Sequence, residues 1–173
     1  KKVGSKIVSF DADGINFEDG EKIESDLTMF ISAGTGHKIL KKSGMPLSEA
    51  GFVKTNYYNE VEGFEGIYVI GDSAALMGPD WKAKQGHVAE VMAKNVAYNI
   101  FQKSQGINSK KSYEGHLNIL CVMDTGDGAA FVYRDSKRGS MIPLPFVGHW
   151  LKKCWGWYCC NSKLCKIPRI PGM

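Results

Sequence analysis

The residues that could bind a ligand most directly lie around position 72. The apolar run GIYVI ends at Gly71-Asp72, and a helix is predicted to begin about 14 residues later, at Gly86. Gly permits close backbone approach, and an Asp at a strand end can accept a hydrogen bond from a ligand hydroxyl. Unpaired N–H groups at a helix start favour an anion. The alternative is a plain strand–loop–helix in which Asp72 only starts a turn.

Cysteine is the second residue type that could do chemistry. Cys121 stands alone in an apolar run, and the other four crowd the last 20 residues: Cys154, Cys159, Cys160 and Cys165. Their C-x4-C-C-x4-C spacing differs from that of a structural zinc site, and His149 is the only His nearby, so no metal site is predicted. A thiolate at Cys121 could act as a nucleophile. Packed, reduced thiols are the default expectation for the cysteines.

The charge is concentrated at one end of the chain. The net charge is +4, and the residues from Arg134 onward contain eight Lys or Arg and one acid, Asp135. A basic tail on a mildly acidic body favours an anionic surface, either phospholipid or nucleic acid, and a solvated tail is the alternative. Trp and Tyr between the basic residues could stack on bases, but no nucleic-acid motif is present, so we predict no nucleic-acid partner.

Positioning these residues requires a mixed α/β fold. Strands are predicted at 6–10, 15–17, 27–32, 66–72, 117–123 and 129–133. Residues 37–63 are predicted to be irregular, with a short extended piece near 52–55. Helices are predicted at 86–102 and 146–165, and Pro143 and Pro145 are expected to stop the pairing after the last strand. The first helix carries an apolar stripe of Ala89, Met92, Ala93, Val96, Ala97 and Ile100.

Length and composition set limits on the whole chain. With 173 residues, 43% hydrophobic and 23% charged, it suits one ordinary domain and is not disordered. It contains no apolar run of about 18 residues and no secretory signal pattern. It opens on strand-like sequence at Lys1 and has no G-x-G-x-x-G after an N-terminal strand. We therefore expect a fragment of a longer protein.

Two stretches resemble flavoproteins with two dinucleotide-binding folds. GIYVIGDSAA (66–75) and KAKQGHVAEVMAKNVAYNI (82–100) resemble the second flavin-contacting segment of that group, and LTMFISAGTG (27–36) resembles the end of its pyridine-nucleotide domain. The resemblance implies FAD as the cofactor of the full-length protein. It implies flavin contacts from Gly71, Asp72, Lys84, Gln85 and Gly86.

A finer resemblance is to the sulfide:quinone oxidoreductase family. NILCVMDTGDGAAFVYRD (118–135) resembles its redox-cysteine segment, and GHWLKKCWGWYCC (148–160) resembles its C-terminal membrane segment. This implies that Cys121 is catalytic and that electrons pass from sulfide through FAD to a quinone. It also implies that Trp155 and Tyr158 contact the quinone and that Leu120, next to Cys121 in the sequence, lines the same quinone pocket.

The resemblance also implies an organisation for the chain. Residues 1–63 would end the NAD(P)-like domain, 64–111 would be the second segment of the FAD domain, and 112–173 would form a hairpin and an amphipathic helix facing membrane and quinone. The missing N-terminal half is then a partner, so we expect the isolated fragment to be inactive and to bind FAD weakly or not at all. Cut strand edges could also pair between chains into a homo-oligomer.

The expected location is the cytoplasmic membrane of a bacterium, on a side that the sequence leaves open. Anionic lipid would be contacted by six basic residues: Arg138, Lys152, Lys153, Lys163, Lys166 and Arg169. The alternative enzymes are a type II NADH:quinone oxidoreductase and a flavocytochrome sulfide dehydrogenase subunit. An alternative of another class is a non-enzymatic membrane-binding module.

Overall fold

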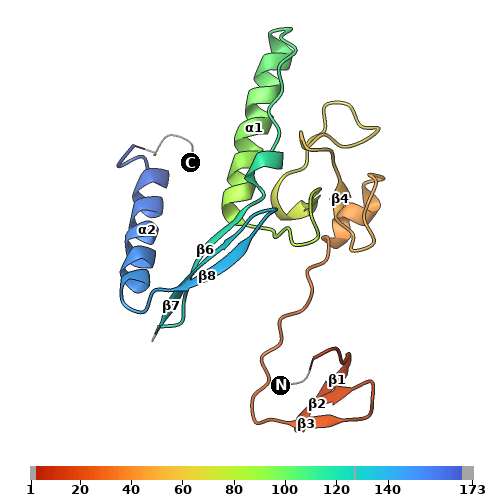
Figure 1. Ribbon diagram of the computed structural model, residues 1–173. Coiled ribbons are helices and arrows are strands. Elements are labelled where there is room, and N and C mark those ends of the chain that lie inside the picture. Colours follow the sequence, from red (N-terminus) through yellow and green to blue (C-terminus); the bar gives the residue numbers. More distant parts are fainter. Residues whose placement is uncertain (1–2, 127, 169–173) are drawn as a thin grey trace. The chain divides into compact units, whose positions relative to one another are not determined.

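The computed structural model describes residues 3–126 and 128–168, and it divides into two compact units (Figure 1). The first unit ends at Gly34 and the second begins at Thr35. Two residues named in the sequence analysis, Lys1 and Arg169, lie outside the described residues.

The first unit is a small antiparallel meander, as the alternation of apolar residues and turns predicts. Its strands are β1 (Ile7–Asp11), β2 (Gly14–Phe17) and β3 (Lys22–Glu24), in the order β1-β2-β3. Gly14 has φ +151°, and a Cβ there would lie 2.1 Å from the Ile23 carbonyl oxygen, so the tight crossing requires glycine. The predicted strands at 6–10 and 15–17 are confirmed.

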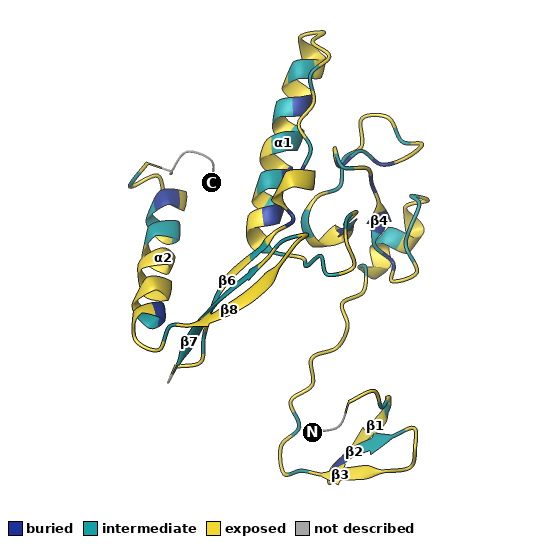
Figure 2. Cartoon of the chain, viewed as in Figure 1, coloured by how far each residue is buried: buried dark blue, intermediate teal, exposed yellow. Residues whose placement is uncertain are grey.

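The strand predicted at 27–32 is wrong. This stretch is irregular, and three of its side chains are almost fully exposed: Leu27 (79%), Met29 (88%) and Ile31 (94%). Figure 2 shows the same segment as an almost continuously exposed connection. An apolar run becomes a strand only where a neighbouring strand satisfies its backbone, and no described strand pairs with this one.

The second unit contains the remaining elements. They are η1 (Lys38–Lys42), β4 (Val53–Lys54), η2 (Gly71–Ser73), β5 (Ala74–Ala75), α1 (Gly86–Ser104), η3 (Glu114–His116), β6 (Ile119–Asp124), β7 (Ala129–Arg134), β8 (Gly139–Pro143) and α2 (Val147–Lys163). Strands β4 and β5 pair in parallel, which confirms an extended piece near 52–55. The core is small and lies between α1 and the segments beside it; its members are Ala74, Val88, Met92, Tyr113 and Leu117.

The strand predicted at 66–72 is also wrong. Only one bridge forms in this stretch, between Tyr68 and Glu60, and the chain then enters the short 3-10 helix η2. The cause is two glycines in the left-handed region, Gly66 (φ +77°) and Gly71 (φ +61°), which turn the backbone at both ends of the apolar run. Asp72 therefore lies in a turn and not at the end of a strand.

The predicted helix at 86–102 is confirmed as α1, but its buried face differs from the predicted stripe. Met92 of the predicted stripe is buried, but Ala93, Ala97 and Ile100 are exposed. Val88 and Asn99 complete the buried face. The side chain of Asn99 donates to the Lys111 carbonyl (3.0 Å) and accepts from the Lys111 N–H (2.7 Å). These hydrogen bonds between Asn99 and Lys111 turn the Asn99 side of α1 inward. A pattern of apolar residues alone does not predict them.

The C-terminal part is a three-stranded antiparallel sheet followed by α2. The sheet order is β6-β7-β8, and the predicted hairpin at 117–133 and the final helix are confirmed. Pro143 was expected to stop the pairing, but β8 pairs with β7 as far as Pro143, opposite Ala130. Proline is tolerated there because β8 is an edge strand. Within residues 3–126 and 128–168, neither α1 nor α2 has the length and apolarity of a membrane-spanning helix.

Candidate functional site: a pocket between a glycine turn and a helix start

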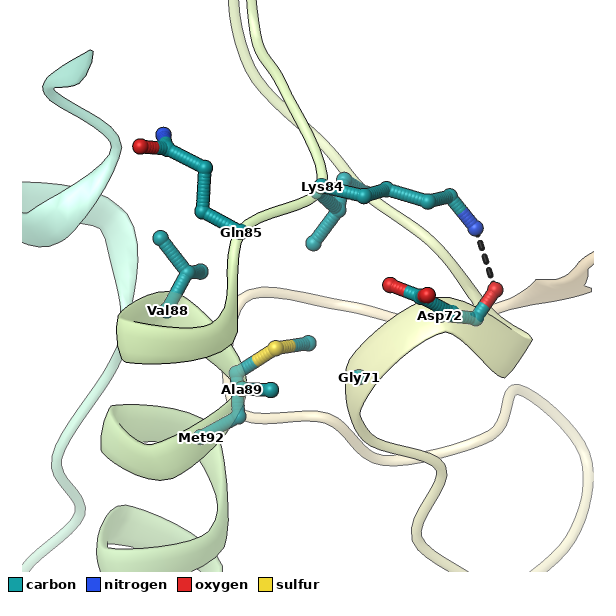
Figure 3. A pocket seen from close by; sticks show the side chains of 8 residues that line it. Gly71, Asp72, Lys84, Gln85, Val88, Ala89 and Met92 are labelled. Atoms are coloured by element: carbon teal, nitrogen blue, oxygen red, sulfur yellow. Dashed lines mark hydrogen bonds between the residues drawn. The ribbon is translucent and has the colours of Figure 1, made fainter. Parts of the chain in front are cut away.

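Four of the five cofactor-binding residues predicted from the sequence, all but Gly86, line one shallow pocket between η2 and the start of α1 (Figure 3). The pocket is lined by Gly71, Asp72, Leu76, Lys84, Gln85, Val88, Ala89 and Met92. Its floor is apolar, since Val88 and Met92 are fully buried. Its rim is polar, and in Figure 3 the Asp72 carboxylate points toward the gap between η2 and α1. Gly86 is the first residue of α1, at the same end.

Lys84 joins the two sides of the pocket. Its Nζ donates to the carbonyl oxygen of Asp72 and, at 3.1 Å, to that of Ala74. The same ammonium lies 3.2 Å from the centre of the Phe52 ring. Partial burial lowers the pKa of Lys84, and the charge of Asp72 opposes that shift. Lys84 thus fixes the backbone that carries Asp72. No sequence signal pointed to Phe52 as its partner.

The turn at Gly71 allows a close approach to the helix. Its φ of +61° suits glycine, and a Cβ there would lie 3.5 Å from the Ala89 Cβ. On the helix side, Gln85 is the N-cap of α1 but its side chain makes no capping hydrogen bond. Nothing lies within 4 Å of a Cβ built on Gly86. The first N–H groups of α1 are therefore not capped by the Gln85 side chain, and they lie beside an exposed carboxylate.

The side chain of Gln85 contains a buried donor that makes no hydrogen bond in the part of the chain that the structure describes. Its Nε2 is buried and has no hydrogen-bond partner within the described residues. Figure 3 shows this amide pointing away from Asp72, across the start of α1. A buried amide donor without an acceptor costs about 1–3 kcal/mol, which a ligand carbonyl at this position would offset.

Cys121 does not line the pocket and is not a packed core thiol. It is exposed in β6, where it pairs with Val132, while Ile119 pairs with Arg134. Paired residues of an antiparallel sheet share a face, and so do alternate residues of one strand. The Cys121 side chain therefore shares a face with Arg134, whose guanidinium lies 5.4 Å from the ring of Trp81 in the loop before α1. The thiol lies on the sheet face that this loop approaches.

Leu120 lies on the other face of the sheet from Cys121. Successive residues of a strand point to opposite faces. Leu120 shares its face with Asp124, whose carboxylate contacts His149 Nδ1 of α2 at 2.8 Å. Helix α2 thus contacts the Leu120 face. Within α2, the rings of Trp155 and Tyr158 lie 5.6 Å apart, so the structure brings together two of the three predicted quinone contacts.

Helix α2 is attached to the sheet at its first turns. Lys152 Nζ donates to the Val122 carbonyl (2.8 Å), and a Cβ on Gly148 would lie 2.5 Å from the Ala129 Cβ. The N–H of Gly126 and then His149 lower the pKa of Asp124.

The tail thiols were expected to be packed by default, yet Cys154, Cys160 and Cys165 are exposed and only Cys159 is half-buried. The described residues contain no cluster of His, Cys, Asp or Glu placed to hold a metal ion.

The known proteins similar to this chain include ferroptosis suppressor protein 1 of three species. The chain is 31% identical to ferroptosis suppressor protein 1 of Taeniopygia guttata over 124 residues, which is 68% of this chain and 31% of that protein. The namesake in Xenopus tropicalis is 32% identical over 117 residues (64% of this chain, 29% of that protein), and the one in Xenopus laevis is 28% identical over 144 residues (80% and 33%). The chain spans about a third of the length of these curated relatives, and no protein-family model matches it.

Proposed function

We propose that this chain is the C-terminal part of a FAD-dependent oxidoreductase that reduces a quinone. The proposal is supported by the similarity to ferroptosis suppressor protein 1, a FAD-binding oxidoreductase that acts on quinones and is related to the flavoproteins with two dinucleotide-binding folds. The mixed α/β architecture is compatible with the C-terminal part of such a flavoprotein. The same proposal assigns residues 1–63 to the end of the NAD(P)-like domain, 64–111 to the second segment of the FAD domain, and 112–173 to the hairpin and amphipathic helix.

The observation that carries the proposal is the pocket between η2 and α1. The residue types around it are those that a flavin needs: Asp72 offers a carboxylate to a ribityl hydroxyl, and the start of α1 offers N–H groups to a carbonyl edge. The pocket has a cavity volume of about 0 Å³, so the flavin would lie against its rim. The unpaired Gln85 amide is a further donor for such an edge. FAD, when bound, would accept two electrons from the donor and pass them to the quinone.

The residues of this chain would position and polarise that cofactor. Lys84 holds the Asp72 backbone so that the carboxylate stays at the rim of the pocket. The positive end of the α1 dipole would stabilise negative charge that develops on the flavin edge as electrons arrive. Val88 and Met92 close the floor and exclude water from below.

The finer proposal concerns the electron donor. Sulfide would reach the flavin through Cys121, whose exposure gives the thiol access and whose sheet face the Trp81 loop approaches. Its position outside the pocket lining favours a second candidate, NADH oxidation as in type II NADH:quinone oxidoreductases, because hydride transfer from a nicotinamide needs no thiol.

One experiment on the full-length protein tests both the reduction of a quinone and the identity of the electron donor. Reduction of a soluble quinone is followed with sulfide and with NADH as separate donors, in the wild type and in Cys121→Ser. A sulfide enzyme loses sulfide-dependent turnover in this variant, whereas an NADH enzyme keeps its rate. Cys159→Ser serves as a control for losing one thiol elsewhere. Absence of quinone reduction with both donors in a protein that retains FAD would contradict the quinone role.

We also propose that α2 binds an anionic membrane surface, where a lipid-soluble quinone would be met. Four large apolar side chains of α2 and its C-cap are exposed, at 59–66% each: Val147, Trp150, Trp157 and Leu164. Lys153 lies beside them, with its Nζ 5.2 Å from the centre of the Trp150 ring. An apolar face with Trp at its centre and Lys at its border is typical of helices that lie in a membrane interface.

A further inference from the structure

The outward face of α2 presents a thiol at the centre of an apolar stripe. Val147, Trp150, Cys154, Trp157 and Leu164 recur at i, i+3, i+7, i+10 and i+17, which places them on one side of a helix. Each of the four apolar members is more than half exposed, and Cys154 is exposed as well. Figure 2 shows that most of α2 is exposed.

The side of α2 that contacts the rest of the unit is a different one. Its contacts are made by Gly148, His149 and Lys152 at the first turns, and by Lys163, which lies 2.5 Å from a Glu90 oxygen of α1, at the last. Docking through these residues leaves the stripe outward. A thiol at this position is presented to whatever the stripe contacts, and the flanking lysines favour an anionic lipid surface.

We propose that Cys154 is a site of S-acylation by a long-chain fatty acyl group, an inference that rests on the proposed membrane contact of α2. Cysteines in amphipathic helices at a membrane surface are the acceptors of such groups. The thiolate attacks the carbonyl carbon of an acyl-CoA thioester, the new S–C bond forms as the bond to CoA breaks, and CoA leaves and takes up the proton that Cys154 lost. The fatty acyl chain then lies between Trp150 and Trp157.

The physical consequence is a second membrane signal. A single acyl chain holds a protein only reversibly, and stable anchoring needs a further signal such as a basic patch, which the tail provides. Cys159 is the matched comparison, since it is half-buried and lies five residues further along the same helix, away from the stripe.

The test uses the full-length protein produced in animal cells. Free thiols are blocked, thioesters are cleaved with neutral hydroxylamine, and the released thiols are tagged with a maleimide polymer that retards the band. We expect one tag in the wild type and in Cys159→Ser, and none in Cys154→Ser. A Trp150→Ser and Trp157→Ser double variant, which keeps the thiol but removes the stripe, should carry the tag on a minor fraction.

Three results would overturn the site: no tag in the wild type, an unchanged tag in Cys154→Ser, or a modification that dithiothreitol removes and hydroxylamine does not. Quinone reduction and vesicle binding of the unmodified protein are measured in parallel. Failure of the tag with intact vesicle binding rejects acylation alone, whereas loss of vesicle binding rejects the membrane contact on which it rests.

Discussion

At the scale of single residues, the pocket depends on one cation and one carboxylate with different tasks. Lys84 is bonded to backbone oxygens and stacked on Phe52, so it holds the turn in place. Asp72 keeps its carboxylate exposed at the rim, where a ligand can reach it. Lys84 therefore has a structural task in the pocket, in addition to the flavin contact that the sequence predicts for it.

The first prediction concerns Asp72. In the full-length protein, Asp72→Ala should raise the FAD dissociation constant about ten- to a hundredfold, because a hydrogen bond to a charged group contributes about 1.5–3 kcal/mol. The measurement is fluorescence titration of the flavin-free protein with FAD. Asp80→Ala is the control, since Asp80 is exposed in the same loop region and does not line the pocket. Equal affinity of Asp72→Ala and wild type would remove Asp72 from the flavin site.

The second prediction concerns the pH dependence of α2 docking. The pKa of Asp124 is lowered in the folded state by the Gly126 N–H and then by His149, so its stabilising contribution is complete above the ordinary value of 3.8. That contribution is lost as the pH falls below this value through the lowered pKa. Trp fluorescence in an acid titration should show α2 releasing in this window, and Asp124→Asn should flatten the transition. Asp26→Asn, an exposed Asp of the first unit, should leave the transition unchanged.

At the scale of elements, glycine decides where α2 can dock. Gly148 is buried at the first turn, against Ala129 and Leu144, whereas Gly156 has open space around it. The two glycines of one helix therefore differ in role: one permits contact and the other only lowers helix stability. Gly71 differs from Gly148, because a Cβ there would make an ordinary 3.5 Å contact with the Ala89 Cβ, so glycine is needed for its φ of +61° and not for space.

The third prediction compares these two glycines. Gly148→Ala places a Cβ 2.5 Å from the Ala129 Cβ and should weaken α2 docking by about 1–3 kcal/mol. Gly156→Ala should instead stabilise the helix by about 0.5–1 kcal/mol, since no atom lies within 4 Å. Hydrogen exchange of the α2 amides in the full-length protein measures both. Faster exchange in Gly156→Ala than in Gly148→Ala would refute the docking geometry.

At the scale of the whole molecule, much apolar surface remains uncovered. The irregular stretch 27–32 and the outer faces of β8 and α2 all expose large apolar side chains. Patches of this kind mark surfaces that bind protein or membrane. A longer flavoprotein, as proposed, would cover the first of these, and a bilayer would cover the outer face of α2.

The fourth prediction concerns membrane binding. Charge reversal at Lys153 and Lys166 should lower the affinity of the full-length protein for phosphatidylserine-containing vesicles at least about tenfold, because each basic residue contributes about 1 kcal/mol at such a surface. Sedimentation with vesicles measures it, and the effect should shrink as salt is raised. Lys94→Glu, on an exposed position of α1, is the control. Equal binding of the two variants would argue against α2 as the contact.

The sequence by itself determined the elements whose stabilisation is local. The helix at 86–102, the hairpin around residues 124–129 and the final helix follow from spacing and turn residues alone. Four of the five residues that a family resemblance placed at a flavin line one pocket, and their flavin contacts stay a prediction. Only the tertiary structure decided the rest. The apolar runs at 27–32 and 66–72 required pairing partners that local sequence does not specify. The faces of Leu120 and Cys121, the buried side of α1 and the bond of Lys84 to the turn depend on distant segments, so no local pattern predicts them.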